Sequence, residues 1–406
     1  MDRIERVTAV LENRRPDRPP VSFWRHFPAD QVAGPAAVRA HLNHLNAFDL
    51  DFLKVMNDNG YPPPYGLRAA GMLRTVHELA AIEELQGNEP EFARQLELLA
   101  TLRRKLGGHL LMITTVFNAW AVLRQLVRPP TVHRPPNLDA ADDEPSARLR
   151  EFHDQDPAAL RHALARIGRS LARFAARCLD AGADGIFLSV RDDWLDHPAT
   201  AGLPAQPETA GILPAPQLDE SATDRPAQPT PLAPAQSAAD SAAPPPTYAA
   251  LVRTTDLQIL AAASRARFNM LHVCGRPVDF AAFAAYPVHA LNWADRAAGP
   301  SITEALKTLE TSQARGGSQP HGAPQPRGAA QPRPAICAGV DNLHTLPDGT
   351  PADCAREVTD TLRQAGGRPI IIAPGCTYDP DRVPRANLEA VVHAAHALAY
   401  ATSASP

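Results

Sequence analysis

Short runs of apolar residues recur along the chain, separated by segments whose apolar positions repeat with a helical period. Each run is brief and almost continuously hydrophobic, which is typical of parallel strands buried on both faces. Eight runs are present: Pro20–Trp24, Asp51–Met56, Leu110–Phe117, Gly185–Val190, Phe268–Cys274, Pro287–Trp293, Pro334–Val340 and Pro369–Ala373. We therefore expect eight buried parallel strands.

Amphipathic helical patterns lie between these runs, at Glu91–Leu106, Pro157–Ala181, Tyr248–Arg267 and Ala352–Gln364 among others. Eight strands that alternate with helices favour an α/β fold of the (β/α)8 TIM-barrel type. An open, doubly wound sheet is the second interpretation, but no G-x-G-x-x-G motif follows the first strand to favour it.

Two segments depart from this pattern, at about 197–247 and 312–334. Both are rich in Pro, Ala, Gln and Gly, and they hold much of the chain's excess of proline, 42 residues in 406. Such segments bury too little apolar surface to offset the entropy of ordering, so we expect two disordered insertions without a binding function. The remaining residues, roughly 330, suit a single elaborated barrel domain over 1–406.

The charge pattern and the absence of long apolar segments narrow the function classes. Forty basic and 44 acidic residues are spread along the chain, and no basic run suggests nucleic-acid binding. No apolar stretch is long enough to span a membrane, and the first residues contain no apolar signal-peptide core. We expect a cytoplasmic protein; the sequence does not indicate its oligomeric state.

Three residues at predicted strand ends have the chemistry of a metal site. His272 and Cys274 are two apart on one strand, so their side chains share a face, and Cys376 follows the last strand. The ends of a closed barrel's strands meet at one mouth, and an imidazole with two thiolates is a familiar zinc set. Asp295 is a candidate displaceable fourth ligand. The opposite interpretation is that these are ordinary buried side chains.

The other three cysteines, Cys178, Cys337 and Cys354, are expected to be packing residues, because they lie within predicted helices or inside a strand. Five scattered cysteines do not suggest a disulfide framework. Other polar residues follow the predicted strand ends. For each, ordinary surface exposure is the alternative to a functional role: His26 is then an exposed loop histidine, and Arg191 to Asp193 form a solvated cluster.

The order of these segments resembles the uroporphyrinogen decarboxylase superfamily over nearly the whole chain outside the two insertions. The resemblance is carried by RPPVSFWR, FDLDFLKVMNDNGYP, ADGIFLSVRDDW, NMLHVCG, VHALNWADR, AGVDNLHTLPDGTP and IIAPGCTYDPDRVPRANLEAV, of which the last two are the most specific. His272-Val273-Cys274 with Cys376 is similar to the zinc signature of the branch of zinc-dependent methylcobamide:thiol (coenzyme M) methyltransferases. Asp295 matches the acidic residue which that branch has on the next strand.

The decarboxylase pattern fits less well. Of the two arginines that bind substrate carboxylates in that enzyme, only Arg25 is matched, and Ala29 occupies the second position. Gln125 stands where the decarboxylase has a tyrosine, and Cys376 where it has a histidine. Its aspartate matches Asp58. A substrate with eight carboxylates needs several cations, and this pattern supplies few.

The resemblance therefore implies a zinc-dependent methyltransferase that moves a methyl group from a corrinoid, on a separate protein, to a small thiol. A decarboxylase of tetrapyrrole biosynthesis is the first alternative, and a non-catalytic metal- or ligand-binding barrel is the second. The residues expected to orient substrate are Asp58, Arg25 and Asp193, and those expected to contact the cofactor are Asn118, Trp120 and Asn292.

Overall fold

A computed structural model describes residues 1–64, 72–128, 144–191, 248–275, 277–314 and 333–398. The first predicted insertion, 197–247, and most of the second, 312–334, lie outside these ranges. Residues 312–314 form the end of a helix, Ile302–Ala314.

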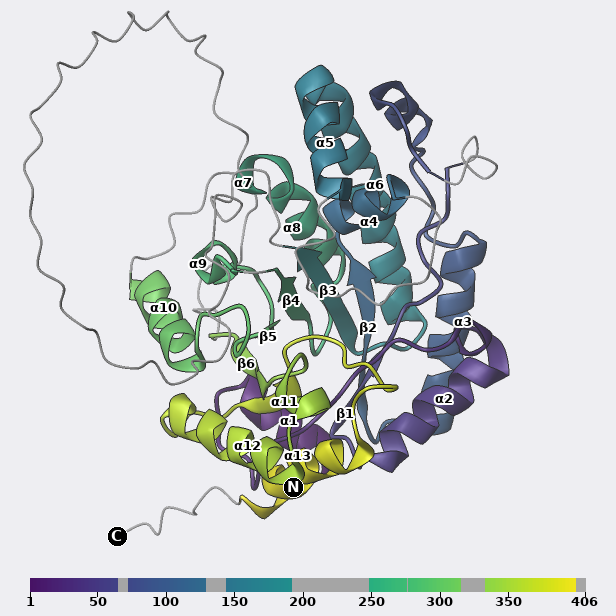
Figure 1. The fold of residues 1–406 in the computed structure, drawn as a ribbon. Coiled ribbons are helices and arrows are strands. Elements are labelled where there is room, and N and C mark those ends of the chain that lie inside the picture. The colour runs from purple at the N-terminus through teal and green to yellow at the C-terminus, as the bar shows by residue number, and fades with distance from the viewer. Residues whose placement is uncertain (65–71, 129–143, 192–247, 276, 315–332, 399–406) are drawn as a thin grey trace, which may run out of the picture.

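Seven parallel strands form one curled sheet in sequence order, consistent with a TIM-like α/β barrel (Figure 1). Seven of the eight predicted strands are thus confirmed. The strands are β1 (Phe52–Val55), β2 (Leu111–Phe117), β3 (Gly185–Arg191), β4 (Met270–Cys274), β5 (Ala290–Trp293), β6 (Ala335–Val340) and β7 (Ile371–Pro374).

The eighth prediction, a strand at Pro20–Trp24, is wrong in its extent. This segment makes a single parallel bridge, from Val21 to Ile372 of β7. Pro20 has no N–H to donate, and the N–H of Val21 donates to the carboxylate of Asp51, at 2.8 Å, rather than to a strand. The carbonyl of Val21 accepts from the N–H of Asp51 at 2.9 Å, so the segment still lies between β7 and the start of β1.

Helices lie outside the strands (Figure 1). They are α1 (Arg3–Leu11), α2 (Gly34–Ala47), α3 (Pro90–Leu106), α4 (Ala119–Leu126), α5 (Glu144–Gln155), α6 (Pro157–Asp180), α7 (Tyr248–Leu251), α8 (Arg253–Ala262), α9 (Phe280–Phe283), α10 (Ile302–Ala314), α11 (Thr345–Asp348), α12 (Pro351–Ala365) and α13 (Arg385–Ala397), with 3-10 turns at Ala29–Gln31 and Val76–Ala81.

Local sequence explains several helix boundaries. Helix α12 begins with Pro351 after Thr350, which forms a capping box with Asp353, and it ends at Gly366 in the left-handed conformation, with φ 59°. The pattern over Tyr248–Arg267 gives two helices, α7 and α8, the second of which ends at Ala262.

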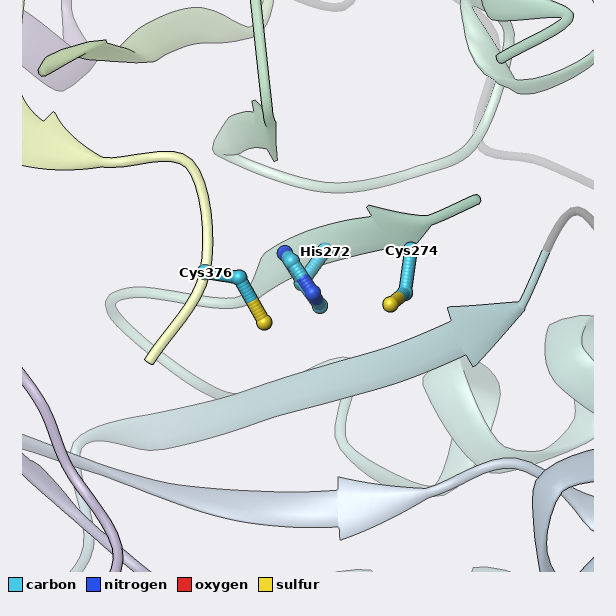
Figure 2. Close-up of side chains that lie close together, drawn as sticks. All are labelled: His272, Cys274 and Cys376. Atoms are coloured by element: carbon cyan, nitrogen blue, oxygen red, sulfur yellow. The ribbon is translucent and has the colours of Figure 1, made fainter. Parts of the chain in front are cut away.

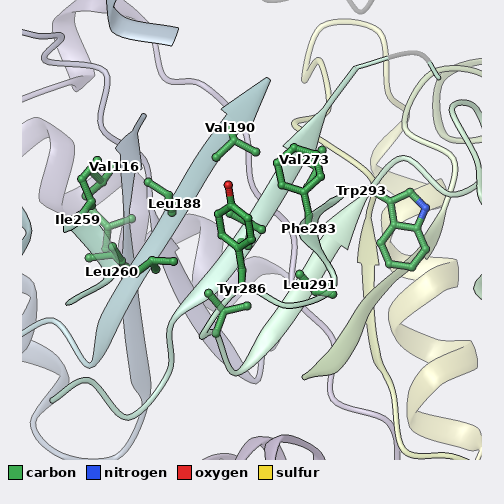
Figure 3. Close-up of a cluster of buried hydrophobic side chains, with 14 of the residues drawn as sticks. Val116, Leu188, Val190, Ile259, Leu260, Val273, Phe283, Tyr286, Leu291 and Trp293 are labelled. Carbon is green, nitrogen blue, oxygen red and sulfur yellow. The ribbon is translucent and has the colours of Figure 1, made fainter. Parts of the chain in front are cut away.

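Alternation along each strand divides the core into two layers. On β3, Leu188 faces the helices and belongs to the large outer cluster, part of which is shown in Figure 3. Phe187 faces inward with Phe52 and Met270, and Val10 of α1 packs against this inner cluster. The inner layer is therefore a packed core, as in other closed barrels, with α1 contributing to it.

The inner layer becomes polar toward the carboxyl ends of the strands. Buried side chains there include Lys54, Thr115, Ser189, His272 and Asn292. This is the end of a barrel at which enzymes of this architecture place their chemistry. None of the described helices is both long and apolar enough to cross a membrane.

Candidate metal centre

His272, Cys274 and Cys376 form a group at this end of the barrel. One potential ligand atom of each lies within 4.8 Å of those of the other two, and all three residues are buried. Figure 2 shows His272 and Cys274 on β4, with Cys376 reaching toward them from the segment after β7. The structure thus brings Cys376 beside two residues that lie more than a hundred positions earlier in the sequence.

Close backbone packing holds Cys376 in place. The residue before it, Gly375, lies so near the chain after β5 that an added Cβ would be 2.3 Å from the Cα of Ala294. Two residues after Cys376, the N–H of Tyr378 donates to the carbonyl of Trp24 at 3.2 Å. The segment is therefore anchored on both sides of the thiol.

Asn292 fixes the orientation of His272. The two residues are partners in the β4–β5 register, and the Nδ1 atom of His272 lies 2.6 Å from the Oδ1 atom of Asn292. The Nδ2 atom of Asn292 donates to the carbonyls of Cys337 and Pro374, so its oxygen must face the histidine. Nδ1 of His272 therefore carries the proton, and the lone pair of Nε2 is left for a metal.

The two thiols of the group influence each other's protonation. A hydrogen bond between them raises the pKa of Cys274 and lowers the pKa of Cys376 to about 6, although burial disfavours both thiolates. The shared hydrogen bond therefore makes Cys376 the more acidic thiol of the pair. In contrast, burial alone raises the pKa of Cys178 and of Cys337.

A cavity of about 200 Å³ opens beside the three residues, and all three line it. Four further lining residues are lysine or arginine: Lys54, Arg124, Arg128 and Arg191. Among the described residues, no aspartate or glutamate lines this cavity. The cavity therefore combines soft metal ligands with a cationic wall.

Lys54 was not singled out by the sequence analysis. It is 4% exposed, and its ammonium lies 4.4 Å from the ring centroid of Phe187. The imidazole of His272 stacks on the same aromatic ring, with 5.2 Å between centroids. The signal that could have identified it is a single lysine within the apolar run FLKVM.

His26 and Asp58 form a pair at the cavity. Nδ1 of His26 lies 2.5 Å from the Asp58 carboxylate, which also accepts from the N–H of Phe27 at 3.0 Å. Burial opposes ionisation of Asp58, but these hydrogen bonds lower its pKa. His26 lines the cavity, whereas Asp58 stands behind it. The guanidinium of Arg25, another predicted orienting residue, lies 5.0 Å from the centroid of the Phe27 ring, and Arg25 does not line the cavity.

Asp295 is not brought into the metal group. After β5 the chain turns, and the carboxylate of Asp295 accepts from the N–H of Gly339 at 2.9 Å. Arg296 lies 3.4 Å away. Burial raises the pKa of Asp295 to about 6. In this structure the carboxylate therefore supports β6 rather than completing the ligand set.

The residues predicted to contact a cofactor are placed away from the cavity wall. Asn118 caps α4 and donates to Tyr248 and Asp256. Trp120 belongs to the outer core. Asn292 contacts His272 instead of the cavity. Asp193 lies outside the described residues.

The donor set suits zinc. Two thiolates and a neutral imidazole nitrogen are soft-to-borderline ligands at which Zn²⁺ takes a tetrahedral geometry, with a fourth position left open. The tautomer imposed by Asn292 gives the histidine the required lone pair. Calcium and magnesium, which prefer oxygen ligands, do not suit this group.

No protein-family model and no curated protein matches this chain. Among solved structures, the chain is similar to a methyltransferase from Methanosarcina mazei, with a TM-score of 0.60 and 14% sequence identity. The match covers 98% of this chain and 99% of the other. At this identity the likeness shows the fold, and it extends over nearly the whole of both chains.

Proposed function

We propose that this protein is a zinc-dependent methyltransferase of the uroporphyrinogen decarboxylase superfamily that transfers a methyl group from a corrinoid to a small thiol. The carrying observation is the convergence of His272, Cys274 and Cys376 within 4.8 Å at the wall of a cavity. The sequence resemblance and the fold shared with a methyltransferase support the same reaction class.

The protein ligands define what the site does. Cys274 and Cys376 would hold zinc as thiolates, and His272 would bind through Nε2 while Asn292 keeps its ring in place. Zinc supplies a Lewis acid that lowers the pKa of a thiol and keeps it as a nucleophilic thiolate near neutral pH. Three protein ligands leave one position for that thiol.

The cavity selects for a small acceptor. Its volume of about 200 Å³ is below the roughly 300–1,000 Å³ of pockets for drug-sized ligands. A small thiol fits such a space, whereas a corrinoid does not. The methyl donor would therefore remain on a partner protein and approach the cavity from outside.

His26 would accept the proton that the thiol loses on binding. Its Nδ1 atom is engaged by Asp58, so Nε2 is the ring nitrogen that remains for a ligand in the cavity. The Asp58 carboxylate fixes the orientation of this ring, as in other histidine–carboxylate pairs. Asp58 would thus act on the substrate through His26. Arg25 belongs to the same loop, where its guanidinium packs over the Phe27 ring.

The test combines metal analysis with a transfer assay. Protein purified without added metal should contain about one zinc per chain, and it should demethylate methylcobalamin when a thiol such as 2-mercaptoethanol is added. Bound zinc without turnover would favour a non-catalytic barrel. Protein without zinc that consumes a tetrapyrrole carboxylic acid would favour the decarboxylase alternative.

A further inference from the structure

Lys54 is buried in the cavity wall, and its ammonium has few hydrogen-bond partners among the described residues. Its ammonium donates to the thioether sulfur of Met56 at 3.3 Å, and a thioether is a weak acceptor. The rings of Phe187 and Trp24 lie 4.4 and 5.8 Å from it. Most of the hydrogen-bonding capacity of this ammonium is thus unused within the part of the chain that the structure describes.

Lys54 also has no direct acidic partner among the residues the structure describes. Asp58 attracts it at longer range, but that carboxylate is hydrogen-bonded to His26 and to the N–H of Phe27. Burial lowers the pKa of Lys54 to about 7, and attraction by Cys376 and Asp58 offsets only part of this effect. A buried ammonium without a counter-ion reduces stability, so the position fits a ligand charge better than a structural role.

The charge of the metal centre provides such a counter-ion. Zinc with two thiolates and a neutral imidazole has no net charge, and a bound substrate thiolate adds one negative charge. At a buried group of ligands that charge requires compensation. Lys54 lines the same cavity as the three ligands, and its ammonium and the His272 imidazole lie against the same Phe187 ring.

We propose that Lys54 supplies the positive charge that compensates a substrate thiolate bound at the metal centre. Lys54 is then a positioning residue for the substrate sulfur, and the property that matters is its charge. This inference rests on the zinc–thiolate function proposed above. Methionine, which is similar in length and uncharged, is the substitution that removes the charge while filling the space.

The experiment uses the full chain loaded with Co²⁺ in place of zinc. 2-Mercaptoethanol, which carries no charge besides its thiolate, is titrated, and binding is followed by thiolate-to-cobalt charge-transfer absorption. Lys54→Met should bind the thiol about tenfold more weakly or worse than the wild type and should keep its cobalt. Lys105→Met, which changes an exposed lysine of α3, should bind it like the wild type.

The melting temperature of the metal-free protein provides a second measurement. Because Lys54→Met removes an unpaired buried charge, it should melt at the same temperature as the wild type or higher. Weaker thiol binding with unchanged or raised stability supports the proposal. Weaker binding with a lowered melting temperature would mean that Lys54 acts through the fold, which overturns it.

Two further outcomes separate this inference from the function on which it rests. If the wild-type cobalt protein binds thiol and Lys54→Met binds it equally well, the role of Lys54 is wrong and the metal–thiol function stands. If the wild type gives no thiolate absorption, the function itself fails, and the role of Lys54 with it. Mercaptoacetate, which carries a carboxylate besides its thiol, is titrated in the same way. If Lys54→Met binds mercaptoacetate more weakly but binds 2-mercaptoethanol like the wild type, the lysine binds a ligand carboxylate and the charge-compensation role is wrong.

Discussion

The ring of His272 and the side-chain amide of Asn292 form a 2.6 Å hydrogen bond across β4 and β5. The same amide donates to Cys337 of β6 and to Pro374 of β7. The orientation of the histidine ligand therefore depends on four neighbouring strands. Cys376, the third candidate ligand, follows directly on the last of these strands, so one buried amide links both sides of the metal centre.

Replacing Asn292 by alanine should weaken zinc binding by about 10–100-fold, the usual effect of removing the hydrogen-bond partner of a histidine ligand. The ring would lose both its fixed tautomer and its orientation. Competition with a chromogenic chelator measures the affinity. Asn269→Ala is the matched control, because Asn269 is also buried and bonded to backbone but does not touch His272. Equal losses in both variants would contradict the role assigned to Asn292.

Cys274→Ser and Cys376→Ser should each remove most of the zinc. Serine is similar in size to cysteine, but its hydroxyl is hardly ionised, and the two remaining ligands would hold the ion poorly. Elemental analysis of purified protein measures the loss. Cys178→Ser, Cys337→Ser and Cys354→Ser replace buried cysteines outside the metal group and should retain about one zinc each. Full retention of zinc in Cys376→Ser would refute the proposed ligand set.

Gly375→Ala should lower both stability and zinc affinity. The added Cβ would lie 2.3 Å from the Cα of Ala294, so the segment carrying Cys376 would have to move away from the chain after β5. Overpacking of this kind costs about 1–3 kcal/mol, which urea denaturation of the metal-free protein measures. Gly108→Ala, whose Cβ would meet nothing within 4 Å, should leave both quantities unchanged. Unchanged zinc affinity in Gly375→Ala would show that Cys376 is positioned in some other way.

His41 should make the fold sensitive to acid. Its Nδ1 atom pairs with the carbonyl of Ala37 at 2.8 Å, and its Nε2 atom accepts from the N–H of Met56 at 3.2 Å, so the ring must be neutral. Burial lowers its pKa from 6.5 to about 4. In the unfolded chain the ring takes up a proton at higher pH. Its stabilising contribution is therefore complete above pH 6.5 and is lost as the pH falls toward 4.

The measurement compares slopes of unfolding free energy against pH, because Asp256 and Asp295, with pKa values raised to about 6 by burial, act in the opposite direction. Between about pH 6 and 4.5, stability of His41→Asn should fall less steeply than that of the wild type, by up to about 1.4 kcal/mol per pH unit. His109→Asn, at an exposed site, should follow the wild type. Parallel curves for His41→Asn and the wild type would contradict a neutral buried His41.

The strands and the pairing of His272 with Cys274 were predictable because each depends on local pattern. Strands buried on both faces are apolar at successive positions, and a spacing of two places His272 and Cys274 on one face whatever surrounds them. The partial failure at Pro20–Trp24 has a long-range cause: the N–H of Val21 donates to the carboxylate of Asp51, 30 residues away. Nothing within the run itself indicates that partner.

The surroundings of the ligands depend on register and on turns. Asn292 contacts His272 because β4 and β5 align these two residues, which the sequence alone does not specify. Asp295 was expected beside the ligands, but a turn after Trp293 directs its carboxylate to the N–H of Gly339. Lys54 was visible as a charge within an apolar run, but its position over Phe187 depends on how three strands align.

The contact between β7 and the start of β1 differs from the contacts between the other neighbouring strands. Asp51, with no exposed surface, accepts hydrogen bonds from Arg6, Arg18 and the N–H of Val21. A ladder of backbone hydrogen bonds distributes the stabilisation over many residues, whereas this contact concentrates it on the Asp51 carboxylate. Local opening should therefore begin here, and amide hydrogen exchange near Val21 should be faster than in β3. Because Cys376 follows β7, any such opening would reach the metal centre directly, and a bound ion would in turn slow the exchange.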